Sequence, residues 1–390
     1  MTRDRGTVVV WGLLANSPFG GMTWQVLHHL EGFRRLGFDV WYVEDSDTPW
    51  MRPGDLELAD DPAPNAAWAA RVLESIGLGD RWILRVPATD ETLGHSRARL
   101  DEVYRRADAV FNLCGSHWLL DHHDAIETIV LLETDPVSPQ VYLAEGEPVL
   151  AEQFGRYAHL FTYGQNIGRA GCPIPTGGLE WNPTRPPVIV DWWSNGAPPA
   201  AAALTTVASW GDHGAGKDVS FNGQTYRWRK DVAFAPYLDL PAHSPLTLEM
   251  SLARIAADDA ARLVEHGWRL RQATELIDPG AYRAYIRGSL GEFTVVKEQY
   301  SRTRSGWVSD RSACYLAAGR PVVTETTGME ELLPTGEGLL TFAEPDGARA
   351  AIDAVAADPA RHGAAALEVA REHFAAERVL RDVAEKVGLL

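Results

Sequence analysis

The chain begins with a pattern that restricts its fold to a parallel sheet. A β-branched run at residues 7–11 leads through a glycine-containing loop into a helical pattern at residues 23–36, with Thr23 as its expected N-cap. Gly37 ends that helix, and residues 38–43 return as a second apolar strand. Because parallel neighbours need a crossover connection of this kind, the first segment predicts a βαβ unit.

Buried-strand patterns recur along the chain, and a second series starts after a change in composition. Apolar runs lie at residues 109–113, 128–132 and 160–163, and Pro and Ala replace any periodic pattern at 183–187 and 197–203. Beyond them we expect strands at 204–209 and 320–325 and helices at 260–272 and 310–318. A chain of 390 residues exceeds the size at which one core usually keeps growing. The sequence therefore predicts two α/β lobes, residues 1–196 and 200–390.

Composition indicates which kinds of partner and which cellular compartment to expect. The formal net charge of −17 argues against a nucleic-acid partner, because binding a polyanion requires an excess of Lys and Arg. No apolar run reaches the roughly 18 residues that cross a bilayer, so no integral membrane segment is expected. The start of the chain fits a buried strand better than a signal peptide, and the three cysteines are too widely spaced for a disulfide framework or a metal knuckle. These features indicate a cytoplasmic protein.

Three segments near the end of the chain carry a family resemblance. They are LAAGRPVV at residues 316–323, TGMEELLP at 327–334 and GEGLL at 336–340. In this order and spacing, residues 313–342 resemble the donor lobe of GT-B glycosyltransferases of the bacterial group 1 type. The resemblance implies two Rossmann-like, doubly wound lobes that face a central cleft, with an N-terminal acceptor lobe, a C-terminal donor lobe and a last helix that can cross back. It also implies transfer of a sugar from a nucleotide diphosphate to a small-molecule acceptor, such as a natural product or a saccharide.

A basic loop in front of a helix is the best candidate for binding the donor diphosphate. The departing diphosphate accumulates negative charge, which backbone amides at a helix N-terminus and nearby cations stabilise. Ser305, Gly306 and Trp307 precede the expected helix at 310–318. Three guanidinium groups lie close to this loop in sequence, those of Arg302, Arg304 and Arg311, and the alternative is that these arginines pair with surface acids. Such a site is expected to need no metal ion and no cofactor, with the nucleotide sugar as co-substrate.

Further donor contacts follow from the resemblance. Lys230 matches a lysine after the first strands of the donor lobe, with a solvated strand end as the alternative. The family's ribose-binding glutamate is Cys314 here, so Asp310 or Ser312 is expected to bind the ribose. A second family glutamate is Gly306, which argues against the retaining subclass with a glutamate pair. The next loop supplies three more residues expected to touch the sugar or its nucleotide: Thr327, Gly328 and Glu330.

An inverting transfer needs a base for the acceptor hydroxyl. Two candidates follow strands of the first lobe, His117 and Asp135, and for each a capping or core role is the alternative. The loop with Phe19, Gly20 and Gly21 is expected to line the acceptor side, because glycines let a ligand approach the backbone.

Other interpretations stay open. Asp45-Ser-Asp47 imitates the metal motif of GT-A glycosyltransferases but lies in the wrong half of the chain. The glycine pattern of a dehydrogenase is absent. A GT-B nucleotide-sugar epimerase or hydrolase would turn over the donor alone, and a non-catalytic GT-B protein would bind it without releasing nucleotide diphosphate. The sugar, the nucleotide base, the acceptor, the stereochemistry and the oligomeric state are left open.

Overall fold

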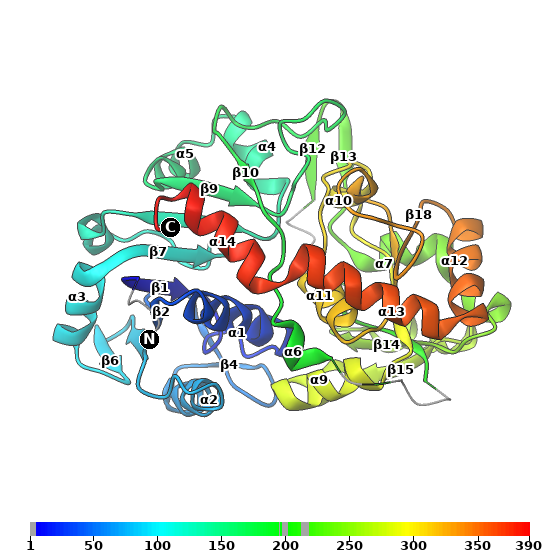
Figure 1. Ribbon diagram of the computed structural model, residues 1–390, viewed down its shortest axis with the longest axis horizontal. Helices are drawn as coiled ribbons and strands as arrows, with labels where there is room; N and C mark the ends of the chain where they lie inside the picture. Colours follow the sequence, from blue (N-terminus) through cyan, green and yellow to red (C-terminus); the bar gives the residue numbers. More distant parts are fainter. Residues whose placement is uncertain (1–4, 195, 197–201, 212–217) are drawn as a thin grey trace.

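The computed structural model describes residues 5–194, 196, 202–211 and 218–390, which form two sheets side by side (Figure 1). The first sheet has the strand order β10-β9-β8-β7-β1-β2-β5-β6, and the second has the order β15-β14-β11-β16-β17-β18. Neighbouring strands are parallel in both sheets except for the edge pair β5 and β6. The predicted α/β class with two parallel-sheet lobes is confirmed.

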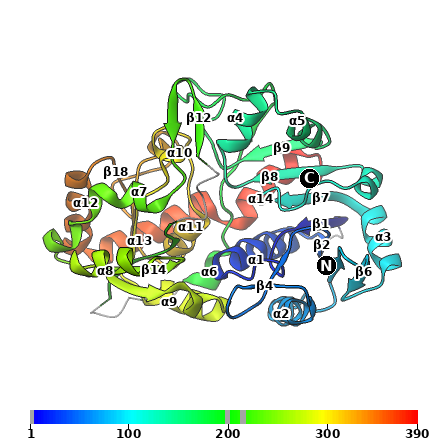
Figure 2. The ribbon, with the colours of Figure 1, turned by 180° about the vertical axis from the view of Figure 1, so that it is seen from behind.

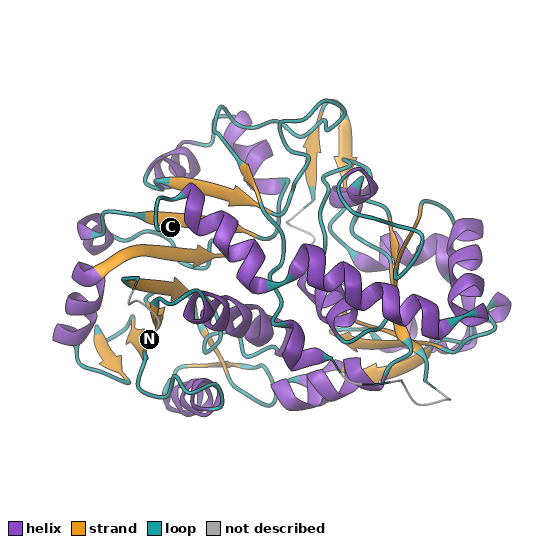
Figure 3. Cartoon of the chain, viewed as in Figure 1, coloured by secondary structure: helices purple, strands orange, loops and turns teal. Residues whose placement is uncertain are grey.

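The first sheet takes its strands from residues 7–183, and Figure 3 shows helices flanking it. Its strands are β1 (Thr7–Trp11), β2 (Asp39–Glu44), β5 (Trp82–Val86), β6 (Glu91–Leu93), β7 (Ala107–Leu113), β8 (Ile129–Glu133), β9 (His159–Thr162) and β10 (Asn182–Pro183). The helices of this lobe are α1 (Gly20–Arg35), α2 (Ala63–Glu74), α3 (Arg97–Arg106), α4 (Ser138–Ala144) and α5 (Pro148–Gly155). A small hairpin, β3 (Trp50–Met51) and β4 (Leu58–Ala59), follows β2.

The second sheet takes its strands from residues 204–342. They are β11 (Leu204–Ser209), β14 (Leu248–Ala253), β15 (Arg269–Gln272), β16 (Gly291–Thr294), β17 (Val322–Glu325) and β18 (Leu339–Phe342). A separate hairpin consists of β12 (Val219–Phe221) and β13 (Gln224–Tyr226). The helices from the linker onward are α6 (Val190–Trp193), α7 (Lys230–Phe234), α8 (Ala257–Glu265), α9 (Pro279–Gly288), α10 (Glu298–Ser301), α11 (Asp310–Ala317), α12 (Pro345–Ala357), α13 (Pro359–Val369) and α14 (Ala376–Lys386).

Two predicted helix boundaries are wrong. Helix α1 begins at Gly20, so Thr23 lies fully buried in its first turn and does not cap it. The predicted helix at 260–272 ends at Glu265, and its last residues form the edge strand β15. Gly267 separates the two elements with φ +89°, a left-handed conformation that ends helices.

The chain crosses between the lobes twice, and the two crossing segments are paired. Val188, after β10, forms a parallel bridge with Ala375, just before α14. Helix α14 then packs on α1 in the first lobe, where a Cβ on Gly32 would lie 2.5 Å from Leu380. Figures 1 and 2 show α14 returning to the first lobe from both viewpoints. The C-terminal helix therefore belongs to the packing of the N-terminal lobe.

Part of the predicted linker at 197–203, residues 197–201, lies outside the described residues. Among the helices of the described ranges, none has the length and apolar character needed to cross a membrane.

Candidate active site between the lobes

A cavity of about 530 Å³ opens where the carboxyl ends of strands from both sheets face each other. The first lobe contributes the start of α1 and Asp135, two residues after β8. The second lobe contributes the residues after β11 and β14, the start of α7 and the start of α11. We call this cavity the cleft. Its volume is in the range of small-molecule sites.

The start of α1 fits tightly against the second lobe. Phe19, Gly20 and Gly21 line the cleft, as the sequence predicted for the acceptor side. A Cβ on Gly20 would lie 2.4 Å from the carbonyl oxygen of Leu276 and 2.9 Å from the ring of Tyr282. The glycine therefore lets α1 approach the other lobe, besides opening the cleft to a ligand.

Cationic side chains gather on the second-lobe wall of the cleft. They are Arg229, Lys230, Arg254, Lys297 and Arg311. Lys230 is half-buried and donates a hydrogen bond from Nζ to the carbonyl oxygen of Val295. Burial lowers the pKa of Lys230 well below its usual value, and the nearby Arg311 and Lys297 lower it further. An anion placed here would relieve this repulsion.

Arg311 is locked in place by the second sheet. Its guanidinium forms an ion pair with the buried Glu292 and donates to the carbonyl oxygen of Val207 at 2.7 Å and to Oγ1 of Thr294 at 3.1 Å. Ser309 caps α11, where its Oγ accepts a hydrogen bond from the Arg311 backbone N–H at 3.2 Å. The N-terminus of α11 thus points into the cleft beside a fixed positive charge.

Asp310 joins the two lobes at the same helix end. Its carboxylate accepts hydrogen bonds from Nε2 of Gln25 at 3.0 Å and from the Tyr163 hydroxyl at 3.4 Å, both first-lobe groups. Burial raises the pKa of Asp310 to about 7, and the negative charge of Asp135 contributes to the increase. Asp310 therefore titrates near neutral pH and shares the cleft with a second carboxylate.

Asp135 is exposed and is held from the opposite lobe. Its Oδ1 accepts a hydrogen bond from the Tyr300 hydroxyl at 2.7 Å. The Tyr300 ring stacks on Trp307 with ring centroids 4.3 Å apart, and Trp307 Nε1 donates to the carbonyl oxygen of Thr134 at 2.8 Å. Two aromatic residues of the second lobe thus fix the loop that carries Asp135.

Comparisons with known proteins agree with this two-lobed arrangement. Residues 252–387 match the sequence model of the family described as glycosyl transferase-like. An alpha-glucosyltransferase solved with UDP-glucose and DNA containing an abasic site is similar at a TM-score of 0.58 and 10% identity, over 98% of this chain and 99% of that one. Anabaena HepE in complex with UDP is similar at a TM-score of 0.57 and 13% identity, over 99% of this chain and 100% of that one. The chain has the GT-B fold.

Among curated protein sequences, none is significantly similar to this GT-B chain. The family match begins in β14, continues through the rest of the second lobe and includes α14, which returns to the first lobe; it contains the segments on which the resemblance was based. The predicted GT-B resemblance is therefore confirmed, and residues 252–387 are similar to the glycosyl transferase-like family.

Several predicted donor residues lie outside the GT-B cleft. Arg302 is exposed and pairs with Glu298 at 3.1 Å, and Arg304 pairs with Glu331. Glu330 accepts a hydrogen bond from the Thr326 hydroxyl. Arg302, Arg304 and Glu330 are each held by a nearby side chain of the second lobe. Their closeness in sequence to the start of a helix therefore did not determine where their side chains point.

The loop expected to bind the diphosphate contacts the first lobe through Asn166, and we call this contact the seam between the lobes. Asn166 of the first lobe donates from Nδ2 to the carbonyl oxygens of Arg304 and Gly328, at 3.0 and 3.2 Å. Its backbone N–H donates to the carbonyl oxygen of Ser305. Four predicted donor residues are used here and do not line the cleft: Ser305, Gly306, Thr327 and Gly328. Lys230, Trp307, Asp310 and Arg311 are the predicted donor residues that do line it.

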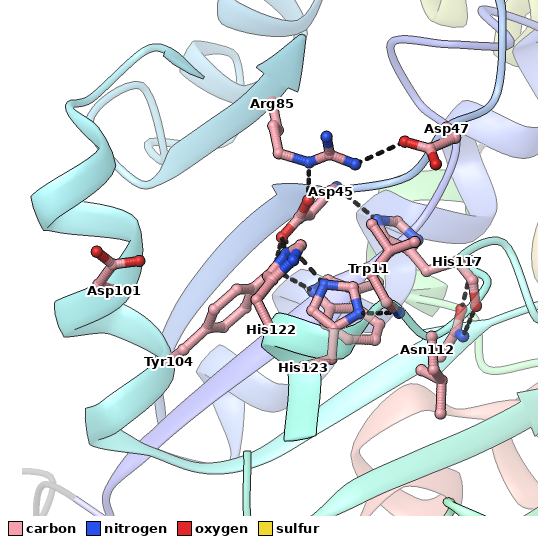
Figure 4. A network of polar contacts seen from close by, with 12 residues as sticks. Trp11, Asp45, Asp47, Arg85, Asp101, Tyr104, Asn112, His117, His122 and His123 are labelled. Carbon is pink, nitrogen blue, oxygen red and sulfur yellow. Dashed lines mark hydrogen bonds and ion pairs between the residues drawn. The ribbon is translucent and has the colours of Figure 1, made fainter. Parts of the chain in front are cut away.

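His117, predicted as a candidate base, is a buried structural residue. Its side chain is 1% exposed, and Nε2 accepts a hydrogen bond from the Asp45 backbone N–H at 2.7 Å (Figure 4). Nδ1 lies 2.8 Å from the Ser116 hydroxyl, and the ring stacks on Trp11. Burial lowers the pKa of His117 to about 3. With both nitrogens occupied and no place in the cleft lining, His117 cannot reach an acceptor there.

Asp45, the first acid of the GT-A-like motif, is the centre of the same network (Figure 4). Its carboxylate pairs with Arg85 and receives hydrogen bonds from His122 and His123 at 2.7 and 3.0 Å and from Tyr104 at 3.0 Å. Asp45, His122 and His123 lie close enough together to hold a metal ion. However, His123 Nδ1 accepts the Leu120 N–H, so its Nε2 carries the proton and acts as a donor. The network satisfies a buried carboxylate, and its residues do not line the cleft.

Sequence reasoning missed several residues of the cleft. Gln25 lies on α1 one turn after the glycine loop, and Arg254 follows β14 with φ +57°. Lys297 follows β16, at the carboxyl edge of the second sheet. Ligands bind at this edge, so Lys297 would have been a candidate if β16 had been predicted. Its Nζ lies over the Trp228 ring.

Proposed function

We propose that this chain transfers a sugar from a nucleotide diphosphate donor to a small-molecule acceptor, without a metal ion. One observation carries the proposal. In a chain with a net charge of −17, the described residues that line the cleft include five cations and two acids, and these five cations come from the second lobe. Such a concentration of positive charge suits a diphosphate, which gains negative charge as the sugar bond breaks.

The donor diphosphate would lie between Lys230, Lys297 and the N-terminus of α11. Lys230 and Lys297 supply charge from the two sides, and the free amides of α11 supply hydrogen bonds. Arg311 adds a charge that Glu292 holds in a fixed orientation. Asp310 at the same helix end is the proposed contact to the ribose or sugar hydroxyls. UDP-glucose is the first donor to test, because similar structures were solved with UDP or UDP-glucose.

Asp135 is the proposed base. It is an exposed carboxylate at the cleft, whereas Asp310 is held by Gln25 and Tyr163. In an inverting transfer the Asp135 carboxylate accepts the proton of the acceptor hydroxyl as oxygen attacks the anomeric carbon and the diphosphate leaves. The Tyr300 hydrogen bond orients this carboxylate.

We favour a small acceptor over DNA. Aromatic rings line it, among them Phe19, Trp228 and Tyr282, and they offer flat apolar faces to an acceptor. The similar alpha-glucosyltransferase was solved with DNA, but this chain carries a large excess of acidic residues. That excess opposes binding of a polyanion outside the cationic wall.

The proposal is tested by donor binding. UDP-, dTDP- and GDP-sugars are added to the protein with EDTA present, and the shift in melting temperature is measured. Lys297→Ala removes a cation of the cleft, and Arg304→Ala removes an exposed cation outside it. We expect one nucleotide class to stabilise the wild type and Arg304→Ala, and to stabilise Lys297→Ala much less. Equal stabilisation of both variants, or none of the wild type, would contradict the proposed donor site.

A further inference from the structure

A second cavity, of about 620 Å³, lies beside the segments that cross between the lobes. Its wall includes Thr184 and Arg185 of the first crossing segment and His373 and Arg378 on either side of the second. None of its lining residues is shared with the cleft. We call this cavity the hinge pocket, because the paired residues Val188 and Ala375 connect its two sides.

Three guanidinium groups line the hinge pocket, together with the carboxylates of Glu372, Asp382 and Glu385. The guanidinium groups belong to Arg169, Arg185 and Arg378. In the described ranges of the chain, none of the three forms an ion pair, although most other arginines here do. Burial lowers the pKa of the half-buried Arg185, the nearby Asp382 raises it, and smaller repulsions from Arg378 and Arg169 lower it. The three cations are therefore close enough to repel one another.

The remaining lining combines apolar, polar and charged groups, and the charged ones are Glu372, Asp382, Glu385 and Lys386. Phe161, Leu332 and Val379 provide apolar surface, and Phe161 is 1% exposed. Burial lowers the pKa of His373, and Arg185 and Arg378 contribute. His373 is then a neutral hydrogen-bonding group near neutral pH. A cavity of this size with clustered guanidinium groups suits a small ligand that carries an anionic group.

We propose that the hinge pocket binds a phosphate group, as free phosphate or as the phosphate of a monoester or lipid headgroup, through Arg169, Arg185 and Arg378. Guanidinium groups match phosphate oxygens in geometry and charge, and binding one would remove the repulsion among the three. Because the pocket contacts both crossing segments, an occupied pocket would favour one relative position of the lobes. This site is separate from the proposed donor site and does not depend on it.

The test measures binding of inorganic phosphate by calorimetry, at constant ionic strength adjusted with chloride. The wild type is compared with Arg185→Gln, with Arg378→Gln and with two matched variants. Arg105→Gln removes an exposed cation on α3, and Arg254→Gln removes a cation of the cleft. We expect the dissociation constant to rise at least tenfold in Arg185→Gln and in Arg378→Gln and to stay within twofold of the wild type in the other two. Arg378 is exposed, so its variant tests the site even if Arg185→Gln fails to fold.

A second arm identifies the source of the phosphate. The same proteins are sedimented with phosphatidylglycerol vesicles and with neutral phosphatidylcholine vesicles. Binding to the anionic vesicles that Arg378→Gln loses would support the site with a lipid headgroup as its ligand. Phosphate binding without vesicle binding would support the site with a soluble ligand. No binding of either probe by the wild type, equal losses in all four variants, or loss in Arg254→Gln alone would overturn the proposal.

Discussion

At the scale of single residues, the chemistry of the cleft depends on two carboxylates that are held differently. Asp135 is exposed and accepts one hydrogen bond from Tyr300, whereas Asp310 is held by Gln25 and Tyr163 and has its pKa raised to about 7 by burial. Environments that separate the pKa values of neighbouring acids give them different roles. We assign proton transfer to Asp135 and ligand binding to Asp310.

Asp135→Asn tests the first assignment. If Asp135 takes the acceptor proton, kcat falls by about 100- to 10,000-fold, because general-base catalysis contributes on that order, while donor affinity is kept. Steady-state kinetics and donor titration measure the two quantities. Tyr300→Phe, which removes the hydrogen bond but keeps the carboxylate, should lose much less activity. A kcat for Asp135→Asn within threefold of the wild type would exclude Asp135 as the base.

Asp310→Asn tests the raised pKa through stability. A carboxyl whose pKa is higher in the folded state stabilises the protein at low pH, and this contribution is lost as pH rises from about 4 through about 7. Between pH 4 and 8 the free energy of unfolding of Asp310→Asn should therefore improve relative to the wild type by up to about 4 kcal/mol. Urea unfolding at both pH values measures this. The control is Asp353→Asn, on an exposed position of α12. A difference that does not change with pH would refute the raised pKa.

At the scale of secondary-structure elements, the sequence was informative about strands and less so about the site. Buried apolar runs predicted β1, β7 and β8 to within two residues, because parallel strands covered on both faces are almost wholly apolar. Two residues predicted to bind ligands, Gly20 and Asp310, start helices and line the cleft, and their binding roles stay predictions. Arg302 and Arg304 instead pair with Glu298 and Glu331, which was the alternative considered for them, and spacing alone could not decide between the two.

The loop at Gly306 gives a prediction at this scale. Gly306 has φ +76°, and a Cβ there would lie 3.0 to 3.1 Å from Asn166 of the other lobe. Gly306→Ala should cost about 1–2 kcal/mol from its backbone conformation, plus the cost of displacing Asn166. Gly223→Ala is the matched control, because its φ is +73° with no atom within 4 Å of the added Cβ. Chemical unfolding should show a larger loss for Gly306→Ala. Equal losses would mean that the seam tolerates the added methyl group.

At the scale of the whole molecule, the lobes are joined by paired crossing segments and by the return of α14. The cleft lies between the facing sheet edges, and the hinge pocket lies beside the crossing segments. Residues of both lobes line each cavity, so a ligand in either one would contact both lobes. The GT-B resemblance predicted that the last helix returns to the first lobe. Its amphipathic pattern could not have predicted this, because it indicates only that one face is covered and not by which lobe.

Leu380→Ala tests how much the first lobe depends on α14. Leu380 is fully buried and packs on Gly32 of α1. Its truncation should lower the free energy of unfolding by about 2–5 kcal/mol, the usual cost of a leucine-sized cavity. Val264→Ala, at an exposed position of α8, should change it by less than about 0.5 kcal/mol. A Leu380→Ala protein as stable as the wild type would show that α14 is only loosely attached.

The most direct test of the central claim is release of nucleotide diphosphate from UDP-glucose and related donors, with a library of small hydroxylated acceptors and EDTA present. The wild type, Lys297→Ala and Arg304→Ala are compared, with mass spectrometry of the acceptor. We predict acceptor-dependent release and a glycosylated product for the wild type and for Arg304→Ala, and a large loss for Lys297→Ala. Release that needs no acceptor, release abolished by EDTA, or equal activity of the two variants would contradict a metal-independent transfer at the cationic wall of the cleft.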